Sequence, residues 1–243
     1  MKTHAAFAFG AVFGGMLCSA SVASAQAGGT DHDRAVKAPF GVGYFGVPGV
    51  AIGTAVGTAT SASLGREVVP APVIGVRYWL NRGMGIDAGV GLGWQSGSSD
   101  TVANGVTTSV DHASAFALVL HGGLPLALAT SKHTTFELIP ELNLGFATGG
   151  QKMGTTDVTR SGFTLDLGAR AGLEVHFGFI GIPELSLVGS VGLYLRREAY
   201  KISGTPAGGT EQSASNADWT LNTTVGPNPW AIFTNNISAI YYF

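Results

Sequence analysis

The sequence contains little cysteine and little charge. Its one cysteine, Cys18, lies within the first 25 residues, and only 12% of all residues are charged. A soluble domain normally carries about twice that share of charged residues. If the first segment is removed, disulfides, thiol catalysis and cysteine metal sites are excluded. The chain therefore either faces lipid or has unusually little solvated surface.

Residues 1–25 have the pattern of a secretory signal peptide. Lys2 supplies a positive start, an apolar stretch covers 5–17, and the small residues Ala23-Ser24-Ala25 form a cleavage motif. The apolar stretch is too short for a membrane-spanning helix, which needs about 20 residues. We expect cleavage after Ala25, which leaves a single domain over residues 26–243.

The rest of the chain shows no pattern for nucleic acid, a cofactor or a metal. Residues 26–243 hold 12 basic and 15 acidic side chains, so no basic footprint for nucleic acid is present. The glycines of 89–93 open no helix, and no P-loop occurs. His32, His121, His133 and His176 are dispersed without metal-ligand spacing. We expect no cofactor and no metal.

Apolar and polar residues alternate with a period of two along most of the chain. In 84–94, for example, Ile86, Val90 and Leu92 share one face and Asp87 lies on the other. Such alternation places successive side chains on opposite faces of a β-strand. The segments that alternate, with a less regular first one, are 40–47, 74–80, 84–94, 116–124, 136–146, 163–177, 185–196 and 231–243.

The connectors between these segments alternate between long and short. Asn81-Arg82-Gly83 and the segment around Gly181 and Pro183 are short and rich in turn-forming residues. The long connectors, such as 95–108 and 203–229, are rich in Gly, Ser, Thr and Asn and are interpreted as mobile outer loops. Short turns at one end and long loops at the other are typical of bacterial outer-membrane barrels.

The last residues repeat the alternation and end in an aromatic side chain. The row consists of Ile237, Ala239, Tyr241 and Phe243. Here the chain resembles the outer-membrane β-barrel proteins of Gram-negative bacteria, above all the small OmpA-, OmpX- and OmpW-like barrels. The resemblance implies that this strand is read by the barrel-assembly machinery and that the protein contacts lipid of the cell outer membrane.

The predicted fold is therefore all-β, a closed antiparallel up-and-down transmembrane β-barrel of about eight strands. If the apolar rows meet lipid, the charged residues of the other rows point into the lumen. Hairpin arithmetic sets Arg77 opposite Asp87 and Asp166 opposite Arg196. We expect a polar lumen network that contains Arg77, Asp87, Glu137, Glu141, Asp166, Arg170, Glu174 and Arg196.

This network allows two interpretations. The charges can neutralise one another as core filler, or they can line a narrow pathway for ions or small solutes. The first predicts a non-enzymatic barrel with a structural role or a role in exposing surface loops, and the second a porin-like channel. A secreted soluble lipocalin-like barrel with its apolar rows inside is a further alternative.

One short motif suggests catalysis. His112 and Ser114 share a face near Asp111 and resemble the His-x-Ser pair of outer-membrane lipid A deacylases. No outward-facing glutamate accompanies them, since Glu137 points inward. We therefore expect no catalytic residues and keep a lipid-modifying hydrolase as an alternative.

Aromatic residues lie near several predicted strand ends, where girdles at the two bilayer interfaces are expected. They are Trp79, Trp94, Trp219, Trp230, Tyr241 and Tyr242.

Overall fold

The computed structural model describes residues 29–58, 61–103, 106–153, 156–205, 209–225 and 236–243. The predicted signal peptide, 1–25, lies outside the described residues. Within them, the predicted all-β fold is confirmed. One short helix, α1 (Asp31–Lys37), precedes the strands, and none of the described helices is long and apolar enough to cross a membrane.

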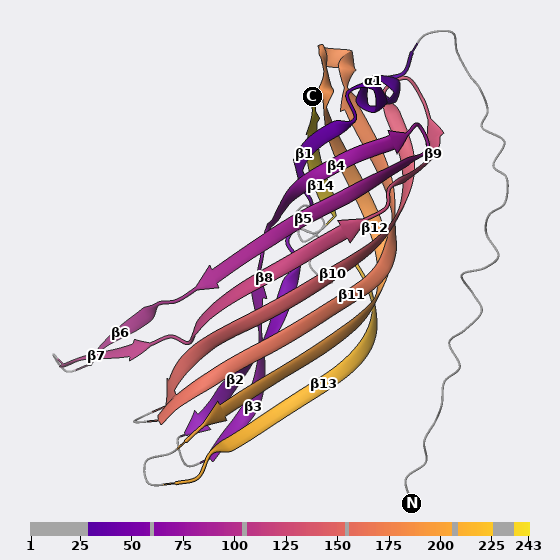
Figure 1. Ribbon diagram of the computed structural model, residues 1–243. Helices are drawn as coiled ribbons and strands as arrows, with labels where there is room; N and C mark the ends of the chain where they lie inside the picture. The colour runs from indigo at the N-terminus through magenta and orange to yellow at the C-terminus, as the bar shows by residue number, and fades with distance from the viewer. Residues whose placement is uncertain (1–28, 59–60, 104–105, 154–155, 206–208, 226–235) are drawn as a thin grey trace, which may run out of the picture.

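Eight antiparallel strands of the described chain form a ring (Figure 1), in which each strand pairs with two neighbours. The ring closes because β11 pairs with β12, and β14 lies between β12 and β1. In ring order the strands are β1 (Phe40–Tyr44), β4 (Val73–Asn81), β5 (Met84–Gln95), β8 (Ser114–Gly123), β10 (Thr134–Met153), β11 (Thr156–Phe177), β12 (Ile182–Gly204) and β14 (Ile237–Tyr242).

Each predicted alternating segment contributes a strand to this ring, but β10, β11 and β12 extend well beyond the prediction. They have 20, 22 and 23 residues, whereas a strand that crosses a bilayer needs about 9–11. β1 and β14 have only 5 and 6 residues. The ring is therefore closed along part of its length, and the long strands continue past it as a curved sheet (Figure 1).

Short turns and α1 lie at one end of the ring, here called the helix end. Gly83 N–H donates to Asn81 Oδ1 at 2.8 Å in one turn, and Gly181 adopts φ of 88° in another. Positive φ is accessible to glycine at no steric cost, which suits Gly181, and both turns lie where the sequence predicts them. α1 begins with a capping box in which Thr30 and Asp33 satisfy each other's backbone N–H groups.

The long connectors are not loops, and this corrects the sequence interpretation. Residues 95–108 contain most of the hairpin of β6 (Ser98–Ala103) and β7 (Val106–Asp111). Residues 203–229 contain β13 (Gln212–Thr223), which pairs with the far half of β12. β9 (Leu126–Thr130) and a 3-10 turn, η1 (Gly178–Ile180), complete the described elements apart from one hairpin.

That hairpin, β2 (Gly49–Thr58) with β3 (Ser61–Pro70), lies inside the molecule (Figure 1). Val50, Ala51 and Ile52 are fully buried, and β2 contacts β10, β11 and β12. A Cβ added at Gly145 of β10 would lie 2.7 Å from Val50, so the hairpin can approach this wall only because glycine is there. The first connector thus packs against the inner wall through β2, whereas Arg66 and Val68 of β3 remain exposed.

Side chains of the ring strands divide into two sets. The outward rows are apolar and exposed, for example Ile74, Leu92, Leu142, Leu167 and Leu193. The inward rows are buried and carry the charged side chains, beside apolar residues such as Val119, Ile139 and Ile240. The polarity is therefore the reverse of that of a water-soluble barrel.

Candidate functional site

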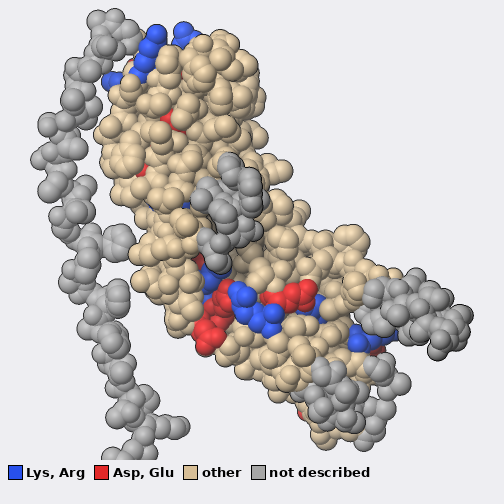
Figure 2. Space-filling model, turned by 180° about the vertical axis from the view of Figure 1, so that it is seen from behind, with Lys and Arg blue, Asp and Glu red and all other residues tan. Residues whose placement is uncertain are grey.

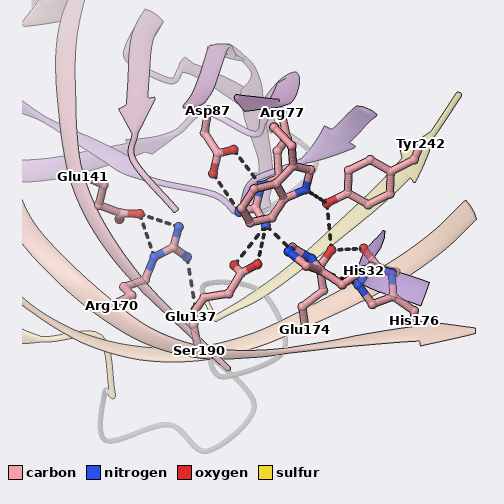
Figure 3. A network of polar contacts seen from close by, with 12 residues as sticks. His32, Arg77, Asp87, Glu137, Glu141, Arg170, Glu174, His176, Ser190 and Tyr242 are labelled. Atoms are coloured by element: carbon pink, nitrogen blue, oxygen red, sulfur yellow. Dashed lines mark hydrogen bonds and ion pairs between the residues drawn. The ribbon is translucent and has the colours of Figure 1, made fainter. Parts of the chain in front are cut away.

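The centre of the interior at the helix end is Arg77, which is 1% exposed (Figure 3). Its guanidinium forms a bidentate pair with Asp87, with N–O distances of 2.7 and 2.8 Å. It also donates to Glu137 at 3.0 Å, and Glu174 Oε2 lies 3.7 Å away. A planar guanidinium can serve several carboxylates at once, so one cation from β4 joins β5, β10 and β11.

Glu174 is held by neutral donors as well. Ser186 Oγ donates to its Oε1 at 2.5 Å, and the Tyr242 hydroxyl donates to the same oxygen at 2.9 Å. Trp79 Nε1–H donates in turn to the Tyr242 oxygen at 3.2 Å. These contacts connect the closing strand β14 with β4, β11 and β12. The network therefore also stabilises the ring where its last strand closes it.

A second group of ion pairs lies further from the helix end. Arg170 donates to Glu141 at 2.8 Å and to Ser190 Oγ at 3.3 Å, and the Tyr194 hydroxyl also donates to Glu141. Arg196 pairs with Asp166 through two contacts of 2.6 and 2.8 Å. The charges of this second group balance.

All eight residues predicted for the polar network thus point inward, but the structure divides them into two groups. Arg77, Asp87, Glu137 and Glu174 form the first, and Glu141, Asp166, Arg170 and Arg196 form the second. The two expected hairpin pairs, Arg77 with Asp87 and Asp166 with Arg196, lie opposite each other in register. Arg196 is the least buried member, with 28% of its side chain exposed.

The inserted hairpin has its own polar anchors. Arg160, fully buried, donates to Gly53 O at 2.7 Å and pairs with Glu67. Gln151 accepts from Ala55 N–H and donates to Ala55 O, both at 2.9 Å. The Gln151 and Arg160 side chains thus bind backbone groups of β2 and keep this strand against β10 and β11.

A cavity of about 570 Å³ with both polar and apolar lining residues remains between the hairpin and the second group of ion pairs. Arg170, Tyr194, Arg196, His121 and Asn143 are among its lining residues. Charged side chains gather in one band near the middle of the face in Figure 2, where the surface is hollowed. The surface above this band is nearly free of charge up to the basic residues near the top.

α1 covers the helix end. His32 packs edge-on against Trp79 with ring centroids 4.6 Å apart, and its Nε2 lies 2.8 Å from Arg82 O. Because a carbonyl oxygen only accepts, Nε2 carries the proton and Nδ1 has a free lone pair. Burial lowers the pKa of His32, which favours this neutral ring. Asp31 pairs with His133 at 2.6 Å, so α1 is also fixed from the β9–β10 turn.

The suspected catalytic pair shows different contacts. Ser114 Oγ accepts from Gly150 N–H and donates to Gly150 O, each at 3.3 Å. His112 is exposed, and no hydrogen bond between it and Ser114 occurs in the described part of the chain.

The aromatic residues are only partly where girdles would require them. Trp94, Trp219 and Tyr241 are exposed, and Arg197 lies 5.5 Å from the Trp219 ring centroid. Trp79 and Tyr242 are buried inside the network, which corrects the girdle interpretation for these two, and Trp230 lies outside the described residues. In the terminal row, Tyr241 and Phe243 are exposed, and Ile237 and Ala239 are half-buried on the same outward face.

Sequence reasoning missed several interior residues. Arg160 and Glu67 lie outside the alternating segments, and Ser186 and Tyr242 lack charge. Extending the alternation of inward and outward residues along the whole of β11 and β14 would have placed Arg160 and Tyr242 inside. No local pattern predicts that His32 meets His176, because α1 lies outside every strand.

No family model matches the chain, and no curated protein matches it either. Among solved structures, the chain is similar to a major outer membrane protein from Thermus thermophilus. The two share 14% identity with a TM-score of 0.36, over 84% of this chain and 98% of that chain. A likeness at this level defines neither a family nor an activity.

Proposed function

We propose that the protein is an integral outer-membrane β-barrel with a filled lumen, which serves a structural role or exposes its far end at the cell surface. The observation that carries this proposal is the inverted polarity of the ring: charged groups are buried inside, and apolar rows are exposed outside. In water these rows would be costly, whereas lipid accepts them.

The exposed apolar rows have the height of a bilayer core. On β10 the outward row is apolar over 136–146, and eleven residues in a tilted strand span about 25 Å. The row turns polar at Thr148 on β10, at Ser161 on β11 and at Arg197 on β12. The strands beyond these positions fit an extension into water on the outer side.

The filled interior supports a structural role. Eight strands leave a lumen that side chains can fill. Here the Arg77 group occupies the helix end and the β2–β3 hairpin packs at the far end, with the cavity of about 570 Å³ between the hairpin and the second group of ion pairs. In this proposal the barrel-assembly machinery reads the strand that ends at Phe243, and outer-membrane lipid covers the exposed apolar rows of the ring strands, here called the belt.

The proposal predicts a large effect of a substitution by arginine at one position of β10 and a small effect at another. Leu142→Arg places a charge in the middle of the belt and is expected to lower the free energy of unfolding in lipid vesicles by about 2–4 kcal/mol. Thr148→Arg, on the same face but beyond the belt, is expected to change it by less than about 0.5 kcal/mol. Urea titrations followed by tryptophan fluorescence measure both.

Equal and small effects of the two substitutions would contradict the lipid-facing belt. They would favour the soluble lipocalin-like alternative, in which the protein folds without detergent.

A filled lumen also predicts that the protein conducts no ions. The wild-type protein in planar bilayers is expected to show no regular conductance steps, because ion pairs and the hairpin occupy the path. Steps that change in Arg170→Gln would contradict this and favour the small-solute channel. A hydrolase would instead change lipid A mass on expression and lose that effect in Ser114→Ala.

A further inference from the structure

Three fully buried side chains meet beneath α1 with unpartnered polar atoms. His32 of α1 and Glu174 and His176 of β11 each offer one ligand atom, and these atoms lie within 4.8 Å of one another (Figure 3). The three residues are at most 1% exposed. Imidazole and carboxylate groups in this combination are typical ligands of zinc and related divalent ions.

Unsatisfied atoms are concentrated at this point. Seven buried side-chain nitrogen and oxygen atoms lack a hydrogen-bond partner in the described part of the chain. Four of them belong to these three residues: His32 Nδ1, Glu174 Oε2, His176 Nδ1 and His176 Nε2. Buried polar atoms are rarely left without partners, so this concentration points to a missing ligand.

The outer contacts of the three residues are those of a supported metal site. The contact from His32 Nε2–H to Arg82 O directs the lone pair of Nδ1 away from the carbonyl and toward the cluster. Ser186 and Tyr242 hold one oxygen of Glu174, and the other makes no hydrogen bond, with Arg77 Nη1 and His176 Nε2 each 3.7 Å away. Arg82 O, Ser186 and Tyr242 thus orient His32 and Glu174 without forming a hydrogen bond to the proposed ligand atoms.

The formal charge of the surrounding group also favours a bound cation. Arg77 contributes one positive charge against three carboxylates, those of Asp87, Glu137 and Glu174. The group therefore carries a formal charge of −2, which one divalent ion would neutralise. Protons on His176 and on one carboxyl group would do the same, so the two accounts make different predictions.

We propose that His32, Glu174 and His176 bind one divalent transition-metal ion of the zinc class, with water as a further ligand. Typical zinc bonds of about 2.0–2.2 Å require the three ligand atoms to approach by about 1 Å. The ion would fasten α1 to β11 and close the helix end of the ring. This inference does not depend on the membrane proposal, since it rests on the interior alone.

The direct test is a titration of chelator-treated, folded, tag-free protein with Zn²⁺ against a chromophoric competitor. The expected result is one ion per chain, with affinity lowered more than tenfold in His32→Gln and in His176→Gln. His121→Gln is the matched control, since His121 is a buried interior histidine outside the cluster. Binding that is unchanged in both cluster variants would overturn the proposal.

A second measurement needs no variant and therefore no assumption about their folding. Co²⁺ added to the folded wild-type protein is expected to produce visible d–d absorption of a low-coordinate site, which Zn²⁺ then removes. Folded protein that gives no such absorption and no stoichiometric Zn²⁺ binding overturns the site and leaves protonation as the source of neutrality.

Discussion

Arg77→Gln is expected to lower the free energy of unfolding by about 3–5 kcal/mol, the cost of removing one partner from a buried ion group. Arg77 is 1% exposed and is the cation shared by Asp87, Glu137 and Glu174. Without it, these carboxylates repel one another in a medium of low polarity. Denaturant titration and heat-dependent gel mobility measure the loss.

The matched control for this prediction is Arg82→Gln at the same end of the ring. Arg82 pairs with Asp33 at 3.0 Å, but 56% of its side chain is exposed. An exposed pair contributes about 0–1 kcal/mol, so this variant should remain close to wild type. If Arg77→Gln were as mild as Arg82→Gln, the interior network would not hold the ring together.

Ile52→Ala is expected to destabilise the protein by about 2–5 kcal/mol by leaving a cavity under the inserted hairpin. Ile52 is fully buried between β2 and the inner wall, whereas Val56 on the same strand is 52% exposed. Val56→Ala is therefore the control and should cost less than about 0.5 kcal/mol. Limited proteolysis of β2–β3 separates release of the hairpin from global unfolding.

If Ile52→Ala left both the protease resistance of the hairpin and the free energy of unfolding unchanged, the packing of β2 against the inner wall would be contradicted. Cleavage within 49–70 at unchanged mobility of the remaining ring would show that the hairpin is a separate packed element.

The sequence predicted the ring because period-two alternation is a local property of each strand. Parity alone placed all eight charged residues inside, and the short turn around Arg82 set the register of Arg77 and Asp87. Parity could not say which carboxylates share a cation. Glu137 and Glu174 meet Arg77 only because β10 and β11 lie across the interior from β4.

The inserted hairpin was not predicted, since Gly, Ser and Thr are also typical of loops. β2 contains Gly49, Gly53 and Gly57 among small residues, a composition that suits close approach to another backbone as well as a flexible connector. Whether this segment is a packed hairpin or a flexible connector depends on its contacts with Arg160 and Gln151, which come from strands about 100 residues later.

The central claim is a lipid-facing belt around a filled polar interior, and single-cysteine labelling tests it most directly. Residues 26–243 contain no cysteine, so Leu138→Cys, Leu142→Cys, Thr148→Cys and Lys152→Cys each introduce one thiol on the outward face of β10. In lipid vesicles, a membrane-impermeant maleimide is expected to label positions 148 and 152 and to spare 138 and 142 until the protein is denatured. Equal labelling of all four positions in the folded protein would contradict the account.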